Sequence, residues 1–102
     1  MLEKDFATQT EHLLNLFGWR WCHFEPAVRQ SGGWATPLRG QKGLPDYVAV
    51  RNGLLLFAEI KGDRGRLTPD QAEWLDDLRQ VDTVRAELWY PEDLHEIKDI
   101  LR

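Results

Sequence analysis

The sequence has one cysteine, three histidines and no long apolar run, and each shortage excludes a class of protein. The single Cys22 cannot form an internal disulfide, which favours a reducing compartment over secretion. None of the histidines has a partner at the spacing of zinc ligands, so we expect no zinc site. No apolar run approaches the roughly 20 residues of a membrane span, and no basic-apolar leader opens the chain. These shortages predict a cytoplasmic protein that does not contact a membrane.

The size of the chain predicts one domain over residues 1–102, because 102 residues leave no room for a second core. Hydrophobic residues make up 42% and charged residues 29%, which are the proportions of an ordinary globular protein. A chain of this length can bury enough surface for one sheet with helices packed on it.

Charge is distributed unevenly along the chain. The net charge of −4 by itself argues against a general nucleic-acid coat protein. Residues 20–66, however, carry eight basic and four acidic side chains, whereas the rest of the chain has a net charge of −8. This separation is expected if a polyanion lies across the central segment and the acidic segments face away.

The central stretch from Leu44 to Gly62 predicts two strands joined by an Asn-Gly turn. A two-residue turn fixes the register, so Asp46 stands opposite Glu59, with about 4.5–5.5 Å between their Cβ atoms. Lys61 shares that face, roughly 6.6 Å further along the strand. Opposed carboxylates destabilise a sheet, and a divalent cation with oxygen ligands, usually Mg²⁺, relieves the repulsion. We therefore expect a metal site at this pair.

A cation held by two carboxylates beside a lysine suits in-line hydrolysis of a phosphodiester. The cation polarises a phosphoryl oxygen, orients the substrate and lowers the pKa of a bound water. Lys61 can stabilise negative charge on phosphorus or position the attacking water. Acyl transfer is disfavoured because no Ser or Cys nucleophile has an apparent His partner. Glycoside hydrolysis also uses two carboxylates, but the basic surroundings favour an anionic substrate. A Glu-x-Lys pattern is also what an exposed surface ion pair without any catalytic role would show.

The whole chain predicts an α/β domain in the order helix, strand, strand, strand, helix, strand, helix. Besides the hairpin, we expect helices over 3–17, over 69–80 and from Pro91, and strands over 19–25 and 84–90. The second hairpin strand is apolar on both sides and is expected at the centre of a sheet with both faces covered.

Two polar helix residues each have a structural and a functional interpretation. Glu3 falls on the apolar stripe of the first helix, so it either points into the site or is a first-turn residue favoured by the helix dipole. Gln71 completes a capping box with Thr68, followed by Pro69 at the first helical position. Gln71 also lies on the side of the helix that can reach the site, although one side chain can hardly perform both tasks.

Residues 26–43 form a long segment with Pro, Gly and Ser, which is predicted as a functional loop. Its three basic residues and one tryptophan suit phosphate contact and base stacking, and two more arginines flank the turn after Lys61. The predicted nucleic-acid contacts are Arg29, Trp34, Arg39, Lys42, Arg64 and Arg66. The alternative is a solvated flap whose tryptophan packs on the core.

The run Pro45-Asp46, followed by Glu59-Ile60-Lys61, resembles the motif of the PD-(D/E)XK nuclease superfamily. More narrowly, nearly the whole chain resembles the VRR-NUC nucleases, including small stand-alone members from phages and bacteria. The supporting matches are Glu3 through Gly18-Trp19, His23, Thr36-Pro37, Gly43 to Asp46, Leu67 to Gln71, Trp74-Leu75 and Trp89 to Asp93. The resemblance implies a restriction-endonuclease-like core, with a mixed central sheet of about four strands flanked by helices.

The resemblance also implies roles for individual residues. The metal ligands it implies are Asp46, Glu59, the carbonyl of Ile60, and Glu3 as the first-helix glutamate. The catalytic residues it implies are Asp46, Glu59, Lys61 and Gln71. Members of the family cleave DNA with Mg²⁺ or Mn²⁺, and several small ones dimerise to act on branched DNA. This chain is therefore predicted to be a homodimeric, metal-dependent DNA endonuclease.

Two alternatives stay open beside the nuclease. A catalytically silent DNA-binding module of the same fold predicts salt-dependent DNA binding without cleavage, and the intact trio of two acids and a lysine argues against it. A structural or partner-docking domain, with the trio as a surface ion cluster, predicts no thermal stabilisation by Mg²⁺ or Mn²⁺.

Overall fold

A computed structural model describes all residues except 25–26, 29–33 and 36–37, and describes 27–28 and 34–35 by their backbone alone. It contains a four-stranded mixed sheet in the order β1-β4-β5-β6 and a separate two-stranded ribbon, β2-β3. The elements are α1 (Glu3–Leu16), β1 (Arg20–His23), β2 (Ala27–Val28), β3 (Trp34–Ala35), β4 (Tyr47–Arg51), β5 (Leu54–Ile60), α2 (Pro69–Arg79), β6 (Val84–Trp89), the 3-10 turn η1 (Pro91–Asp93) and α3 (Leu94–Leu101). The predicted α/β fold and the order of its main elements are confirmed. The β2-β3 ribbon corrects the prediction that residues 26–43 are a loop throughout.

The β4-β5 hairpin forms as its turn predicts. Asn52 and Gly53 have φ values of 50° and 81°, which match the twist of a tight two-residue hairpin. The register pairs Val48 with Phe57 and ends at Tyr47 opposite Ala58. Because β6 pairs in parallel with the other edge of β5, β5 is a central strand, as predicted.

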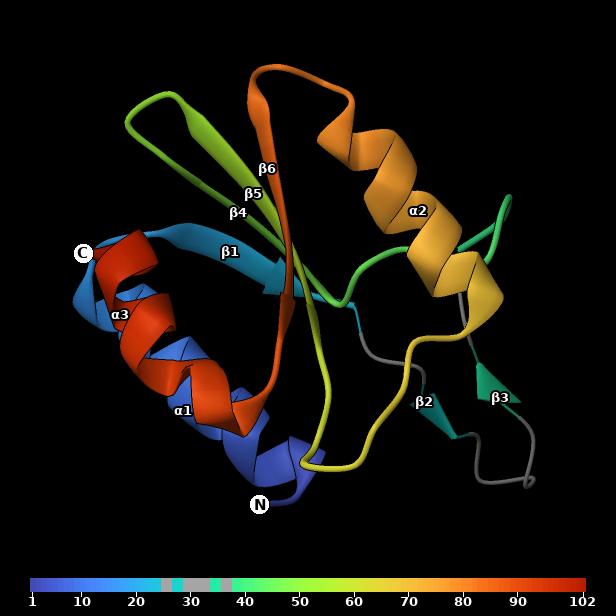
Figure 1. Cartoon of the computed structure of the whole chain (residues 1–102), viewed down its shortest axis with the longest axis horizontal. Helices are drawn as coiled ribbons and strands as arrows, with labels where there is room; N and C mark the ends of the chain where they lie inside the picture. The colour runs from blue at the N-terminus through green and yellow to red at the C-terminus, as the bar shows by residue number, and fades with distance from the viewer. Residues whose placement is uncertain (25–26, 29–33, 36–37) are drawn as a thin grey trace.

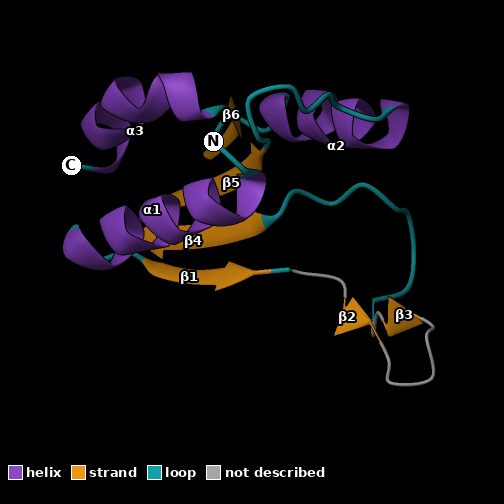
Figure 2. Cartoon of the chain, turned by 90° about the horizontal axis from the view of Figure 1, so that it is seen from below, coloured by secondary structure: helices purple, strands orange, loops and turns teal. Residues whose placement is uncertain are grey.

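Helices lie on both sides of the sheet. Figure 1 shows α1 and α3 on one side and α2 on the other, and Figure 2 shows the same separation from below. The core on the α1 and α3 side includes Phe6, Leu14 and Ile97, packed against Leu56 and Ala58 of the sheet. On the other side α2 packs chiefly against β6. Within the described ranges, no helix is both long and apolar enough to cross a membrane.

The α2 side of the sheet is covered only in part, which corrects the prediction that both faces of the central strand are covered. Val50 is 40% exposed, and Val48 and Leu55 are half-buried. These side chains line a shallow hollow of about 290 Å³ together with Arg20 and Cys22. Because α2 packs over β6, the hairpin end of β4 and β5 stays open.

Arg51 fastens the hairpin end of the sheet to the helices. Its guanidinium donates hydrogen bonds of 2.7–3.0 Å to the carbonyls of Phe17, Leu101 and Arg102. It also lies 4.7 Å from the ring centre of Trp19, whose Nε1 donates to Leu101 as well. Helix C-termini present unpaired carbonyls and the negative end of the dipole, so one cation stabilises the ends of α1 and α3 together. The charge of Arg51 therefore stabilises the ends of the helices and is not directed at the candidate metal site.

Gly43 lets the segment before β4 lie against the start of α2. Its φ is +97°, and a Cβ there would be 2.5 Å from the carbonyl carbon of Asp70. We expect Gly43→Ala to lower the free energy of unfolding by about 2–4 kcal/mol, from backbone strain and displacement of α2. Gly40→Ala, whose φ is +114° and whose added methyl would meet nothing within 4 Å, should cost only about 1–2 kcal/mol. Urea unfolding measures both, and equal losses would contradict the contact.

Candidate metal and catalytic site

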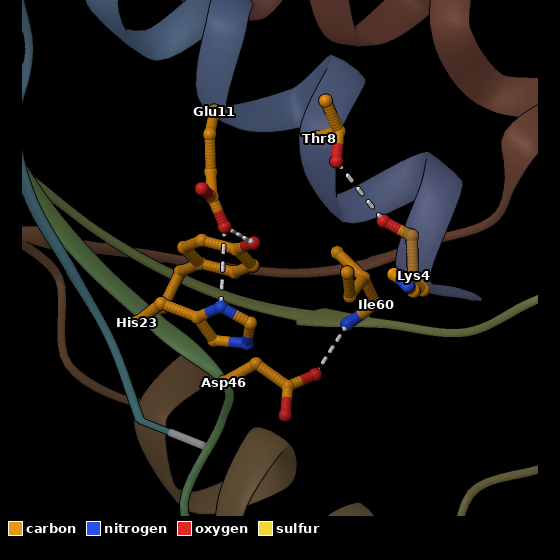
Figure 3. Close-up of polar contacts among 7 residues, drawn as sticks. Lys4, Thr8, Glu11, His23, Asp46 and Ile60 are labelled. Carbon is orange, nitrogen blue, oxygen red and sulfur yellow. Dashed lines mark hydrogen bonds and ion pairs between the residues drawn. The ribbon is translucent and has the colours of Figure 1, made fainter.

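The candidate site lies where β4 and β5 separate. Their pairing ends at Tyr47 and Ala58, whereas β5 continues to Ile60 beside β6. The backbone N–H of Ile60 donates to Asp46 Oδ2 at 2.9 Å, as Figure 3 shows. The Asp46 carboxylate, just before β4, is thus the acceptor of this hydrogen bond. Pro45, the residue before it, is buried. This hydrogen bond holds the Asp46 carboxylate against β5.

Glu59 is nearly inaccessible to solvent, with 1% of its surface exposed. Its Oε2 lies 3.3 Å from Lys61 Nζ, but Oε1 is buried and has no hydrogen-bond partner among the described residues. Burial, and then the charge and hydrogen bonding of Asp46, raise the pKa of Glu59 from 4.5 to about 8. Lys61 acts in the opposite direction, because its positive charge favours the ionised form. The folded chain therefore holds the Glu59 proton more tightly than water does.

Lys61 is held from both ends. Its backbone N–H donates to the Trp89 carbonyl at 3.0 Å, and its side chain is only 13% exposed. The structure thus brings Asp46, Glu59 and Lys61 together, as the hairpin register predicts. Their catalytic and metal-binding roles stay predictions.

A dication with oxygen ligands fits the Asp46–Glu59 pair. Two neighbouring carboxylates, one of them buried with an oxygen that no donor reaches, are a donor set suited to Mg²⁺ or Mn²⁺. In the described part of the chain, no group of three His, Cys, Asp or Glu side chains has the arrangement of a metal site. Waters and substrate phosphate would therefore complete the coordination, as is usual for Mg²⁺.

No model of a known protein family matches the chain, and no curated protein is significantly similar to it. The resemblance to VRR-NUC nucleases therefore stays a prediction from the motif. What supports it physically is the closeness of Asp46, Glu59 and Lys61.

Glu3 is not buried with the apolar stripe of α1 and has the exposed first-turn position that was the structural interpretation of this residue. The buried residues of the helix begin at Phe6, and Glu3 is exposed in the first turn. Its backbone N would be 3.0 Å from a Cβ placed on Gly62, so the start of α1 lies against the turn after Lys61. The ligand role of Glu3 remains a prediction from the resemblance.

Glu11 is the α1 carboxylate that contacts the strands beside the site. Its Oε2 accepts a hydrogen bond from the Tyr47 hydroxyl at 2.5 Å and lies 3.2 Å from His23 Nδ1. The His23 ring stacks on Tyr47 with 4.2 Å between ring centres, and Figure 3 shows the imidazole between Glu11 and Asp46. This cluster joins three elements, so no local sequence signal reveals it, and His23 is packed within it.

Gln71 forms the predicted capping box of α2. Its backbone N–H donates to Thr68 Oγ1 at 3.2 Å, and its Oε1 accepts from the Thr68 N–H at 3.0 Å. The structural interpretation of Gln71 is therefore confirmed. The catalytic role that the resemblance implies for Gln71 stays a prediction.

The predicted nucleic-acid contacts differ in what surrounds them. Four of them are exposed: Arg39, Lys42, Arg64 and Arg66. Lys42 is exposed but lines a hollow of about 420 Å³ with Asp70, Glu73 and Asp77, whose charges oppose its own. Arg29 lies outside the described residues, and so does the side chain of Trp34, whose backbone is in β3.

Proposed function

We propose that this chain is a metal-dependent DNA endonuclease that hydrolyses phosphodiester bonds with Mg²⁺ or Mn²⁺. The observation that carries the proposal is the buried Glu59 carboxylate beside Asp46 and Lys61, with a pKa raised to about 8. Such a group destabilises the folded chain once it ionises, because a buried charge needs compensation. Asp46 and Glu59 would together hold a dication, whose positive charge would supply that compensation.

The residues would divide the chemistry among them. Asp46, oriented by the Ile60 N–H, and ionised Glu59 would hold the dication, which when bound polarises a phosphoryl oxygen and acidifies a water. The Lys61 ammonium, 3.3 Å from Glu59, would offset negative charge that develops on the phosphoryl oxygens. Glu59 would release its proton as the metal binds, so metal affinity would rise with pH.

The charge around the site supports DNA as the substrate. Arg64 and Arg66 are exposed just beyond Lys61 in the chain, which makes them candidates for contact with DNA phosphates. Phosphate contacts of this kind make affinity fall with rising salt. Branched DNA as the preferred substrate, and a homodimer as the active form, are carried by the family resemblance and belong to the proposal.

Cleavage of labelled DNA tests the proposal. The panel contains linear duplex, single strands, forks, flaps and four-way junctions, each with Mg²⁺, with Mn²⁺ and with EDTA. We expect cleavage of at least one substrate with a dication, none with EDTA, and a loss of about 100- to 1,000-fold in Asp46→Ala. No cleavage of any substrate, or full activity in Asp46→Ala, would contradict the proposal. Salt-dependent binding without cleavage would identify the silent DNA-binding module instead.

A further inference from the structure

We infer that Gly65 and Tyr90 position the Lys61 ammonium through contacts of the turn that follows Lys61. This inference rests on the proposed function. A Cβ added to Gly65 would lie 2.9 Å from Lys61 Cβ and 3.1 Å from Lys61 Cδ. The aliphatic part of the lysine therefore lies flat on Gly65, at a distance that leaves no room for a methyl group. Gly65 does not have the positive φ of Gly43 or Gly53, so space for the lysine is what favours glycine here.

The turn that carries Gly65 is held in place by hydrogen bonds. The Gly65 N–H donates to the Gly62 carbonyl at 3.0 Å, which closes the turn after Lys61. The Tyr90 hydroxyl donates to the Gly65 carbonyl at 3.0 Å. Tyr90 itself is held by Asp93, whose Oδ2 accepts from the Tyr90 N–H at 2.8 Å. The turn is thus tied to the C-terminal end of β6.

The same end of β6 also holds the backbone of Lys61. The Trp89 carbonyl accepts from the Lys61 N–H, and the next residue, Tyr90, fixes the turn on which the lysine rests. The base of the side chain cannot move away from Gly65 without breaking one of these hydrogen bonds. A lysine side chain is flexible in isolation, and this support restricts it so that Nζ stays beside Glu59. The proposed hydrolysis depends on positioning of this kind, because the protein itself contributes little covalent chemistry to it.

Cleavage kinetics of Gly65→Ala and Tyr90→Phe test the inference, with Gly53→Ala as the control. At saturating Mn²⁺ and DNA, we expect Gly65→Ala to lower kcat by about 10- to 100-fold. Tyr90→Phe, which loses one hydrogen bond, should lower kcat by about 3- to 10-fold. KM and the Mn²⁺-induced shift in Tm should stay within about twofold of the parent, because the carboxylates are untouched. Gly53→Ala also replaces a turn glycine, at a φ of +81° with nothing within 4 Å of the new methyl, and should keep kcat.

A second measurement separates this inference from the proposed function. The Lys61 Nζ resonance in NMR spectra, assigned with Lys61→Met, should shift in Gly65→Ala and Tyr90→Phe but not in Gly53→Ala. If the parent protein cleaves no DNA, the proposed function fails, and this resonance still decides whether Gly65 positions the lysine. An unchanged resonance with an unchanged kcat in Gly65→Ala would overturn the inference.

Discussion

Lys61→Met should lower the rate of DNA cleavage by about 100- to 1,000-fold at saturating metal and DNA. Methionine keeps an unbranched apolar stem to lie on Gly65, but it removes the ammonium that stands 3.3 Å from Glu59 Oε2. The negative charge of the transition state then loses its fixed counter-charge. Single-turnover cleavage, measured with protein in excess over labelled DNA, reports this loss without a contribution from product release.

The substitution has a second effect that the experiment must separate. Lys61 lowers the pKa of Glu59, so its removal raises that pKa and weakens metal binding at neutral pH. Measurements at pH 9 with excess Mn²⁺ restore metal binding, and the rate should remain low. Lys98→Met, an exposed position on α3, should cleave like the parent. Full recovery of Lys61→Met at pH 9 would show that the lysine acts only through Glu59.

Glu59→Gln should stabilise the metal-free protein at alkaline pH. The pKa of Glu59 is about 8 in the folded chain and 4.5 without the surrounding structure, so the folded state binds this proton more tightly. The stabilisation that the proton contributes is complete below pH 4.5 and is lost as pH rises through 8. Glutamine cannot ionise, so its advantage in free energy of unfolding should reach about 2–4 kcal/mol at pH 9. Urea unfolding in EDTA at pH 5 and pH 9 measures it, and little difference is expected at pH 5.

A dication should offset this difference in stability. At pH 8 the parent should gain about 3 kcal/mol when Mn²⁺ is present at 100 times its Kd, because only the folded state binds it. Glu59→Gln lacks one charged ligand and should gain much less. Glu73→Gln, at an exposed position on α2, should respond to Mn²⁺ like the parent. An equal gain from Mn²⁺ in Glu59→Gln would place the metal elsewhere. In the metal-free experiment, a loss of stability in Glu59→Gln at pH 9 would show that the ionised carboxylate is already compensated.

The sequence by itself determined the parts of this protein that follow from neighbours along the chain. Asn52-Gly53 permits two consecutive positive φ values, and the two-residue turn then sets every pair of the hairpin. The alternation of a strand places Lys61 on the face of Glu59. The capping box of Thr68 and Gln71 spans three residues and needs no distant partner. The α/β class and the grouping of the three candidate residues were therefore predictable.

Tertiary structure alone decided how these groups behave. Glu59 is buried, and its pKa is raised, because β5 lies between β4 and β6 and because Asp46 reaches the Ile60 amide where the strands separate. Helical spacing assigns Glu3 an angle around α1 but does not say where the covering sheet ends, so only the fold could choose the exposed first-turn position from the two that the sequence left open. The contact of Tyr90 with Gly65 joins residues 25 apart in sequence. Local rules specify direction and register, whereas burial, charge regulation and cross-element contacts depend on the packing of segments that only the complete fold brings together.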